Sequence, residues 1–238
     1  ASYQTEDYEG VVTETAELLS RFPGSEYEDA ALYDRGWAFY HMARYNEAIS
    51  SFEDLLAVSD DALKRDRSMF QMGESYILLG KNDEARAEYG HLVEQYDFTE
   101  LSNRELLQMK AQRLRGLVKE TTRELVAKAQ IRIADSYASE GRVSEAIDAY
   151  SKVPTNYPQE TLIVQKSYDN MATMVLEQQG VDPGVRILRQ AIEQVDDTYF
   201  RGRAQLRIAG VLFREGRYRD AIAEYQVYRR AYGSQAQA

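Results

Sequence analysis

Residues 36–52 read GWAFYHMARYNEAISSF, and the spacing inside this stretch decides the fold. Gly36 precedes Phe39 by three positions and Ala48 precedes Phe52 by four, so the members of each pair share one face of a helix. A small residue lets two helices approach closely, and an aromatic ring fills the space beyond it. The stretch therefore predicts two short helices joined by a tight corner.

The same arrangement of a small residue, an aromatic and an alanine recurs along the chain. The recurrences are Gly73, Tyr76, Gly80, Ala85 and Tyr89, then Ala134, Tyr137, Gly141, Ala146 and Tyr150, then Ala209, Gly216, Tyr218, Ala221 and Tyr225. If the alanine of the second helix serves as a marker, successive markers lie 37, 61, 38 and 37 residues apart, at Ala48, Ala85, Ala146, Gly184 and Ala221. A period near 37 with one interruption predicts a solenoid of stacked helix pairs that carries an insertion.

This pattern resembles the tetratricopeptide repeat family. In that family a small residue and an aromatic mark the first helix of each repeat (helix A), and an alanine and an aromatic mark the second (helix B). The resemblance covers most of the chain and is weakest at Gly184 and Leu188, which replace the alanine and the aromatic. It implies an all-α, right-handed α-solenoid of about five antiparallel helix pairs, and a surface for binding in place of a reaction centre.

Helical periodicity and capping residues predict the individual elements, and no stretch alternates long enough with the period of two typical of a strand. The expected helices lie at 6–20, 26–42, 45–57, 62–79, 82–96, 103–139, 143–152, 160–179, 184–195, 200–215 and 218–231. The prolines are expected at corners, and they are Pro23, Pro154, Pro158 and Pro183. We group the helices into a single solenoid, 1–238, with a partial leading repeat at 1–25, repeats at 26–60, 61–98, 127–158 and 198–232, a helical insertion at 99–126, a divergent repeat at 159–197 and a tail at 233–238.

The insertion has two interpretations. Residues 102–105 have the form of a capping box, and apolar residues keep helical spacing from Leu106 to Ile133, which favours one long helix over 103–139. Residues 121–124 offer a second start signal, which favours two helices. In either case an amphipathic segment projects from the repeats, and its apolar side needs a covering surface.

Composition and motifs exclude several kinds of function. The chain has no cysteine, and no run of about 18 apolar residues that would span a membrane. His41 and His91 lie in different repeats, and neither has a second ligand at metal-binding spacing. Phosphate-loop, dinucleotide and nucleophile-elbow motifs do not occur. We therefore predict no enzymatic activity, no metal and no cofactor.

Charge is distributed unevenly along the chain. Residues 1–100 hold 22 acidic and 8 basic residues, a net charge of −14, and residues 101–238 hold 17 and 21, a net charge of +4, which together give −10. An acidic chain of this kind argues against nucleic acid as a partner. The asymmetry either serves solubility alone or lets the two ends meet chemically different surfaces.

The family resemblance implies an inner wall built from the A helices. Projected onto this chain it gives an aromatic group, Tyr33, Trp37, Tyr40 and Phe70, and a basic group, Lys128, Arg132, Arg203, Arg207 and Arg214. Helical spacing alone also places the first three rings on one stripe and the last three arginines on another. The rings either anchor an apolar side chain of a partner or pack the end of the solenoid, and the arginines either grip carboxylates or form a solvated face.

The expected function is that of a protein–protein interaction scaffold or adaptor. Its partner would be a protein or peptide with an apolar anchor and acidic groups. The alternative is an architectural subunit of a bacterial envelope assembly, or a self-assembling oligomer, that uses the insertion helix and the charge asymmetry. The envelope setting comes from residues 22–27, FPGSEY, which are similar to an inter-repeat corner in periplasmic and outer-membrane members of the family. A cytoplasmic location stays open.

Overall fold

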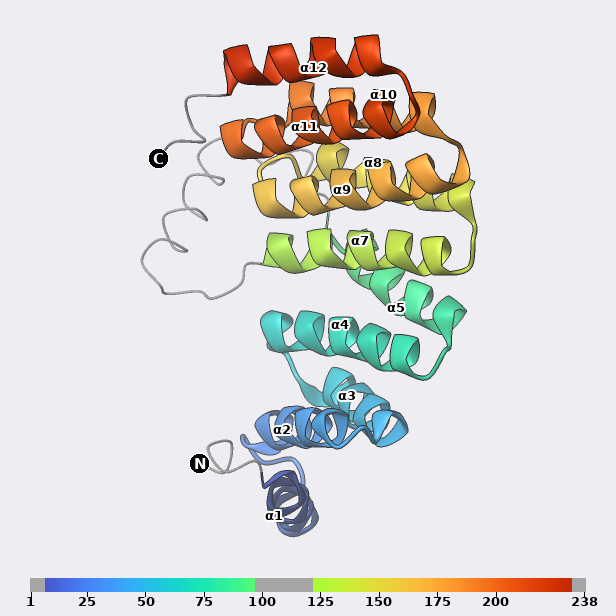
Figure 1. Cartoon of the computed structure of the whole chain (residues 1–238). Helices are drawn as coiled ribbons and strands as arrows, with labels where there is room; N and C mark the ends of the chain where they lie inside the picture. Colours follow the sequence, from blue (N-terminus) through green and yellow to red (C-terminus); the bar gives the residue numbers. More distant parts are fainter. Residues whose placement is uncertain (1–6, 97–121, 233–238) are drawn as a thin grey trace. The chain divides into compact units, whose positions relative to one another are not determined.

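The computed structural model describes residues 7–96 and 122–232, and these form α-helices joined by short corners (Figure 1). No strand occurs within these two ranges. The chain divides into two compact units, Ala1–Ile133 and Ala134–Ala238, and each is described by itself. The prediction of an all-helical fold is confirmed.

Consecutive helices pack against one another from α1 to α5 and from α8 to α12. The first unit contains α1 (Tyr8–Arg21), α2 (Glu28–His41), α3 (Tyr45–Val58), α4 (Ala62–Leu78), α5 (Asn82–Glu94) and the first part of α7 (Thr122–Ser139). The second unit contains the rest of α7, then α8 (Val143–Asn156), α9 (Thr161–Gln178), α10 (Val181–Gln194), α11 (Thr198–Arg214) and α12 (Tyr218–Ala231). By the repeat pattern, α2, α4, α7, α9 and α11 are A helices, and α3, α5, α8, α10 and α12 are B helices.

Most of the predicted helix ends agree with the structure to within two residues. The exceptions are α8, which continues to Asn156, and α10, which begins at Val181. The predicted helix over 103–139 ends at Ser139 as expected. Its residues 103–121 lie outside the described ranges, so the choice between one helix and two stays a prediction.

Both exceptions correct the expectation that every proline lies at a corner. Pro183 lies in the first turn of α10, where a backbone N–H has no partner within the helix and its absence does no harm. Pro154 lies inside the last turn of α8. A proline there removes the N–H that would bond the carbonyl of Tyr150, four residues earlier.

A neighbouring helix supplies the donor that Pro154 lacks. The hydroxyl of Ser167, on α9, is buried and donates a hydrogen bond to the Tyr150 carbonyl oxygen at 2.8 Å. The helix therefore continues through the proline because the freed carbonyl is satisfied from outside. The same bond ties α8 to α9.

The corners between the A and B helices of four repeats share one geometry. A residue with a left-handed backbone occupies the equivalent corner position in each, at Ala43 (φ 57°), Gly80 (73°), Gly141 (71°) and Gly216 (77°). The next residue donates its N–H to a carbonyl five residues earlier, in the bonds Arg44 to Phe39, Lys81 to Tyr76, Arg142 to Tyr137 and Arg217 to Leu212, at 2.9–3.0 Å. This is the Schellman ending of a helix, and it turns the chain into the B helix.

In the repeats that begin with α2 and α4, the A helix meets its B helix at the glycine of the sequence pattern. A Cβ atom added to Gly36 would lie 2.5 Å from the Phe52 ring, and one added to Gly73 would lie 2.5 Å from the Tyr89 ring. Both rings are fully buried. Gly184 makes the equivalent close contact from the B helix, because a Cβ atom added there would overlap the Leu176 side chain of α9.

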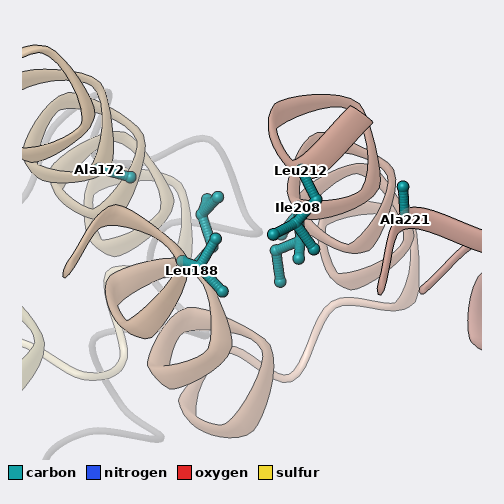
Figure 2. Packing of buried hydrophobic residues seen from close by; sticks show 7 residues of the cluster. Ala172, Leu188, Ile208, Leu212 and Ala221 are labelled. Atoms are coloured by element: carbon teal, nitrogen blue, oxygen red, sulfur yellow. The ribbon is translucent and has the colours of Figure 1, made fainter. Parts of the chain in front are cut away.

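Each unit has its own apolar core between stacked pairs. In the first unit, Ile49 and Phe52 of α3 pack with Met72 of α4, which belongs to the next repeat. In the second, Leu188 of α10 packs with Ile208 of α11, and Figure 2 shows these two side chains pointing toward one another. The B helix of one repeat is thus buried by the A helix of the next.

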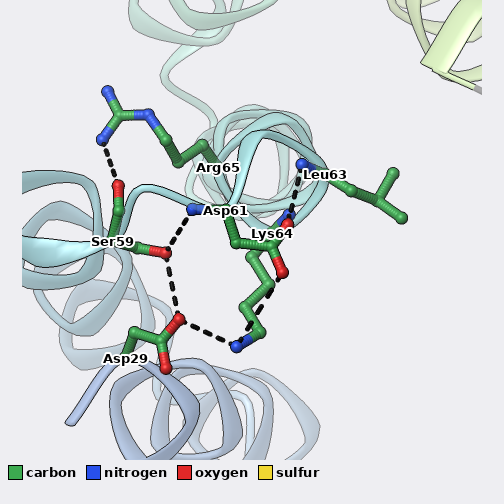
Figure 3. Close-up of polar contacts among 6 residues, drawn as sticks. All are labelled: Asp29, Ser59, Asp61, Leu63, Lys64 and Arg65. Carbon is green, nitrogen blue, oxygen red and sulfur yellow. Dashed lines mark hydrogen bonds and ion pairs between the residues drawn. The ribbon is translucent and has the colours of Figure 1, made fainter. Parts of the chain in front are cut away.

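The corner between α3 and α4 is held by a polar network (Figure 3). Asp61 caps α4 by accepting the backbone N–H groups of Leu63 and Lys64 at 3.0 and 3.1 Å. Asp29 of α2 accepts the Lys64 ammonium at 2.8 Å and the Ser59 hydroxyl at 3.1 Å. The hydrogen bond from Lys64 holds the pKa of Asp29 below its ordinary value, so this carboxylate stays charged and links two repeats.

The glycine contact at the first helix of a repeat yields a stability prediction. Gly73→Ala is expected to destabilise the protein by about 1–3 kcal/mol, because the buried Tyr89 ring has nowhere to move. Gly90→Ala, in α5, meets no atom within 4 Å and is the matched control. It is expected to stabilise by about 0.5–1 kcal/mol through higher helix propensity. Urea unfolding followed by circular dichroism measures both, and equal effects of the two substitutions would contradict the packing argument.

The Pro154 and Ser167 pair yields a second prediction. Ser167→Ala leaves a buried carbonyl without a donor and is expected to destabilise by about 1–3 kcal/mol. In a Pro154→Ala background residue 154 regains an N–H, so the same substitution is expected to cost at least about 0.5 kcal/mol less. Ser151→Ala, at an exposed hydroxyl of α8, serves as the control. Additive effects in the double-mutant cycle would show that Ser167 does not replace the missing donor.

Candidate partner-binding surface

Three aromatic rings of α2 lie together, as their spacing predicts. The Trp37 ring contacts Tyr33 and Tyr40 edge to face, with centroids 6.2 and 5.9 Å apart. It also stacks on His41 at 5.7 Å, and His41 stacks on Tyr8 of α1 at 4.9 Å. Tyr33, Trp37 and Tyr40 are half-buried. The structure therefore forms a continuous aromatic surface across α1 and α2.

The same rings contribute to packing. Phe52 of α3 contacts Tyr33 and Trp37 edge to face, at 6.3 and 6.4 Å. Phe70 of α4 is half-buried and contacts the Tyr89 ring at 5.5 Å. The core therefore holds one side of the aromatic surface, and the exposed part of its half-buried rings is accessible to a partner.

A charged pair lies beside this surface in the first unit. Arg132 of α7 binds both carboxylate oxygens of Glu74 of α4, at 2.7 and 2.9 Å, and the Tyr89 hydroxyl donates to Glu74 at 2.6 Å. Burial raises the pKa of Tyr40, while its hydrogen bond with Gln71 acts in the opposite direction and the Glu74 charge adds to the rise. Tyr40, Glu74 and Arg132 thus lie near one another on three successive A helices.

The second unit repeats this arrangement with other residues. Asp135 of α7 accepts hydrogen bonds from the Tyr150 hydroxyl and from the Asn170 amide, the latter at 2.9 Å. At the equivalent positions of the following pair, Arg207 of α11 donates to the Thr173 hydroxyl of α9 at 2.7 Å. The bonds Arg132–Glu74, Asn170–Asp135 and Arg207–Thr173 therefore form one series, which we call the inter-repeat polar ladder.

The remaining predicted basic residues differ in what they contact. Arg203 and Arg207 both approach Asp169 of α9, at 2.5 and 3.5 Å, and with Ala204 they line a cavity of about 280 Å³. Lys128 pairs with Glu124, one turn earlier in α7, at 3.3 Å. Arg214, at the end of α11, is exposed, and its guanidinium makes no ion pair with any described residue.

The structure thus brings Tyr33, Trp37 and Tyr40 together and engages Arg132 and Arg207 in the polar ladder. Asp135, Asp169 and Thr173 are not among the site residues predicted from the sequence. One signal was available for the acids of the ladder, because Glu74 and Asp135 each precede a helix-B tyrosine by 15 residues. Arg203 and Asp169 carry no comparable local signal.

Metal-binding clusters and membrane-spanning helices are not found in the described ranges. Among the residues of the two ranges, no three His, Cys, Asp or Glu side chains are grouped to hold a metal ion. No described helix combines the length and the apolar character needed to cross a bilayer.

These features define a class, the α-solenoid built from helix pairs, and comparison with known proteins names the family. Two family models, both described as tetratricopeptide repeat, match residues 30–59, 67–99 and 128–160 in one case and 172–236 in the other, which together exceed half of the chain. The chain belongs to the tetratricopeptide repeat family. Proteins of this family are protein-interaction scaffolds. The comparison with curated protein sequences finds no match.

Solved structures show the same fold at low sequence identity. The apo form of RapI has a TM-score of 0.65 at 11% identity, with 95% of this chain and 60% of that chain covered. BtubC from P. vanneervenii has a TM-score of 0.53 at 14% identity, with 97% and 90% covered. MamA has a TM-score of 0.52 at 16% identity, with 81% and 91% covered. These likenesses concern the fold alone.

The polar ladder yields a prediction that tests its role in stability. Arg132→Leu and Tyr89→Phe are each expected to destabilise the protein by about 1 kcal/mol, because each removes a donor to Glu74. Their effects are expected to couple by about 0.5 kcal/mol or more, since they share one carboxylate. Arg21→Leu, which breaks an exposed pair with Glu17, is the control and should change stability by less than about 0.5 kcal/mol. Strict additivity in urea unfolding would contradict a shared acceptor.

Proposed function

We propose that the first unit binds a segment of a partner protein through Tyr33, Trp37 and Tyr40, with an apolar side chain of the partner packed against these rings. The observation that carries the proposal is that these rings are held by the core and also keep exposed area. Phe52 contacts Tyr33 and Trp37, and Tyr40 packs against the same core cluster. Rings that are already fixed lose little freedom on binding, which makes them efficient anchors.

The residues around this surface extend the proposal to polar groups of the partner. Lys128 and Arg132 supply positive charge from α7 in the same unit, and Phe70 adds apolar area from α4. Because Arg132 already binds Glu74 through two contacts, a partner carboxylate would add to that pair without replacing it. The aromatic rings therefore carry most of the expected binding energy.

In the second unit we propose Arg203 and Arg214 as the principal groups for acidic side chains. More than half of the Arg203 side chain is exposed, although one face of its guanidinium is held by Asp169. Arg207 is more buried and bonds to Thr173 and Asp169, so it serves mainly to position Arg203 and the helix pair. The proposal includes no catalytic step and no cofactor.

The test compares Trp37→Ala with Leu78→Ala, which removes an exposed apolar side chain of α4 outside the aromatic surface. Each protein is immobilised and used to capture proteins from native lysate, and the affinity of a protein that wild type captures is then measured by calorimetry. Trp37→Ala is expected to weaken binding more than tenfold, or about 1.4 kcal/mol, and Leu78→Ala to leave it unchanged.

Because Trp37 also packs on Phe52, the folded state needs its own control. Trp37→Phe keeps an aromatic ring in the cluster and is expected to lose less affinity than Trp37→Ala. Thermal unfolding of all three variants shows whether a loss of binding follows a loss of structure. Unchanged affinity in folded Trp37→Ala would place the binding surface elsewhere.

A bacterial envelope location is a separate proposal. It is supported by the corner at residues 22–27, where Phe22 and Tyr27 are exposed at the α1–α2 connection. Fractionation of the source cells with detection by antibody tests it, and recovery in the cytoplasmic fraction alone would contradict it.

A further inference from the structure

The repeats of this chain show which face of a B helix is normally covered. In α3 the residues one and four positions after the alanine marker are Ile49 and Phe52, and both are buried against the next A helix. In α10 the equivalent residues are Val185 and Leu188, which are buried in the same way. This face is apolar because a following helix packs on it.

The same face of α12 is exposed. Ile222 and Tyr225 follow Ala221 by one and four positions, yet their exposed fractions are 57% and 43%. Tyr218 and Arg229 lie on the same stripe, since the spacings of three and four repeat along it. We call these four residues the α12 face. The Phe213 ring of α11 contacts Tyr218, with centroids 5.2 Å apart, while Ile222 and Tyr225 stay exposed. A solenoid end of this kind ordinarily carries a polar outer surface.

The α12 face is also basic. The two acids of the helix are engaged elsewhere, because Asp220 binds Arg217 and Glu224 binds Arg189. Arg229 on this face and Arg219 beside it are exposed and form no ion pair with any residue in the described ranges. A surface that covers this face must therefore be apolar with acidic groups at its edge.

A groove of this character lies on α1. It has a volume of about 500 Å³ and is lined by Glu14, Glu17, Leu18, Arg21, Phe22, Ser25 and Tyr27. The aromatic rings in it have exposed fractions of 59% for Phe22 and 60% for Tyr27. Glu14 and Glu17 correspond by the 37-residue period to Ser51 and Asp54 of α3, which bond Arg35 of their own A helix at 3.1 Å. The groove is therefore a helix-packing face that has no A helix on it within the described residues.

We propose that these two faces bind one another between copies of the chain, so that the α12 face of one copy docks in the α1 groove of the next. Ile222 and Tyr225 would pack on Leu18 and Phe22, and Arg229 would pair with Glu14, since Glu17 already binds Arg21. The contact is heterologous, because two different faces meet, and it joins copies head to tail. It is distinct from the aromatic surface of α2 and does not depend on the proposed function.

Charge favours this occupant over a pair of α12 faces. Two such faces would bring Arg229 and the adjacent Arg219 of each copy together with no acid on either stripe. The α1 groove instead offers Glu14, while its second acid, Glu17, pairs with Arg21 at 2.6 Å. The acidic N-terminal part and the basic C-terminal part of the sequence point the same way.

The test uses the full chain and multi-angle light scattering over a range of concentrations. Wild type is expected to exceed the monomer mass of 27.3 kDa as concentration rises, and to return toward it in high salt. Two blocked variants complete the design, Glu14→Arg with Glu17→Arg in the α1 groove and Ile222→Glu with Arg229→Glu on the α12 face. All four positions lie on the surface of helices, and circular dichroism verifies that both variants fold.

Each blocked variant alone is expected to stay monomeric. An equimolar mixture of the two is expected to stop at twice the monomer mass, because it retains one complementary pair of faces. Leu162→Glu, at an exposed position of α9, is the control and should associate like wild type. The proposal is overturned if wild type stays monomeric, if the groove variant alone still associates, which would indicate an α12 pair, or if the mixture fails to form dimers.

Discussion

The close approach of an A helix to its B helix at a glycine is the contact on which the rest of the structure depends. At Gly36 and Gly73 an aromatic ring of the B helix lies where a Cβ atom would be, so the two helices are closer than ordinary side chains allow. That contact sets the angle between the two helices of a pair. The next A helix then packs on the opposite side of the B-helix ring. The aromatic surface of α2 follows from it, because Phe52 supports Tyr33 and Trp37 from below.

The polar ladder adds a second relation between neighbouring pairs. The aromatic ring of a B helix packs against apolar side chains of its own A helix and of the next A helix. Such apolar packing tolerates small shifts of one helix relative to the other. In the ladder, the carboxylates of Glu74 and Asp135 each accept one hydrogen bond from a tyrosine of their own repeat and one from a side chain of the next repeat. Hydrogen bonds depend on both the direction and the distance between donor and acceptor. The apolar contacts supply most of the driving force, and the ladder selects one alignment of adjacent repeats. A surface used for recognition gains from such alignment, because its groups are held in place before a partner arrives.

Much of this architecture could be predicted from the sequence because its signals are local. The spacing of Gly73, Ala85 and Tyr89 indicates a helix pair, and glycines such as Gly80 mark where the chain must adopt a left-handed conformation. Pro154 misled the prediction, because its effect depends on Ser167 in another helix. The partner of Arg132 was equally hidden, since Glu74 is 58 residues away across the insertion. The stripe of Tyr33, Trp37 and Tyr40 was visible, but spacing alone does not reveal how much of each ring the core uses.

The hydrogen bond from Ser167 to Tyr150 has a consequence for how such repeats can be exchanged. The proline belongs to one repeat and the serine to the next, yet neither is well accommodated without the other. A chimera joined between α8 and α9 would separate them. The Tyr150 carbonyl would then lack a hydrogen-bond donor, and the buried Ser167 hydroxyl would lack its acceptor. The natural unit of recombination in this part of the chain therefore runs from the middle of one repeat to the middle of the next, and does not follow the visible helix pairs.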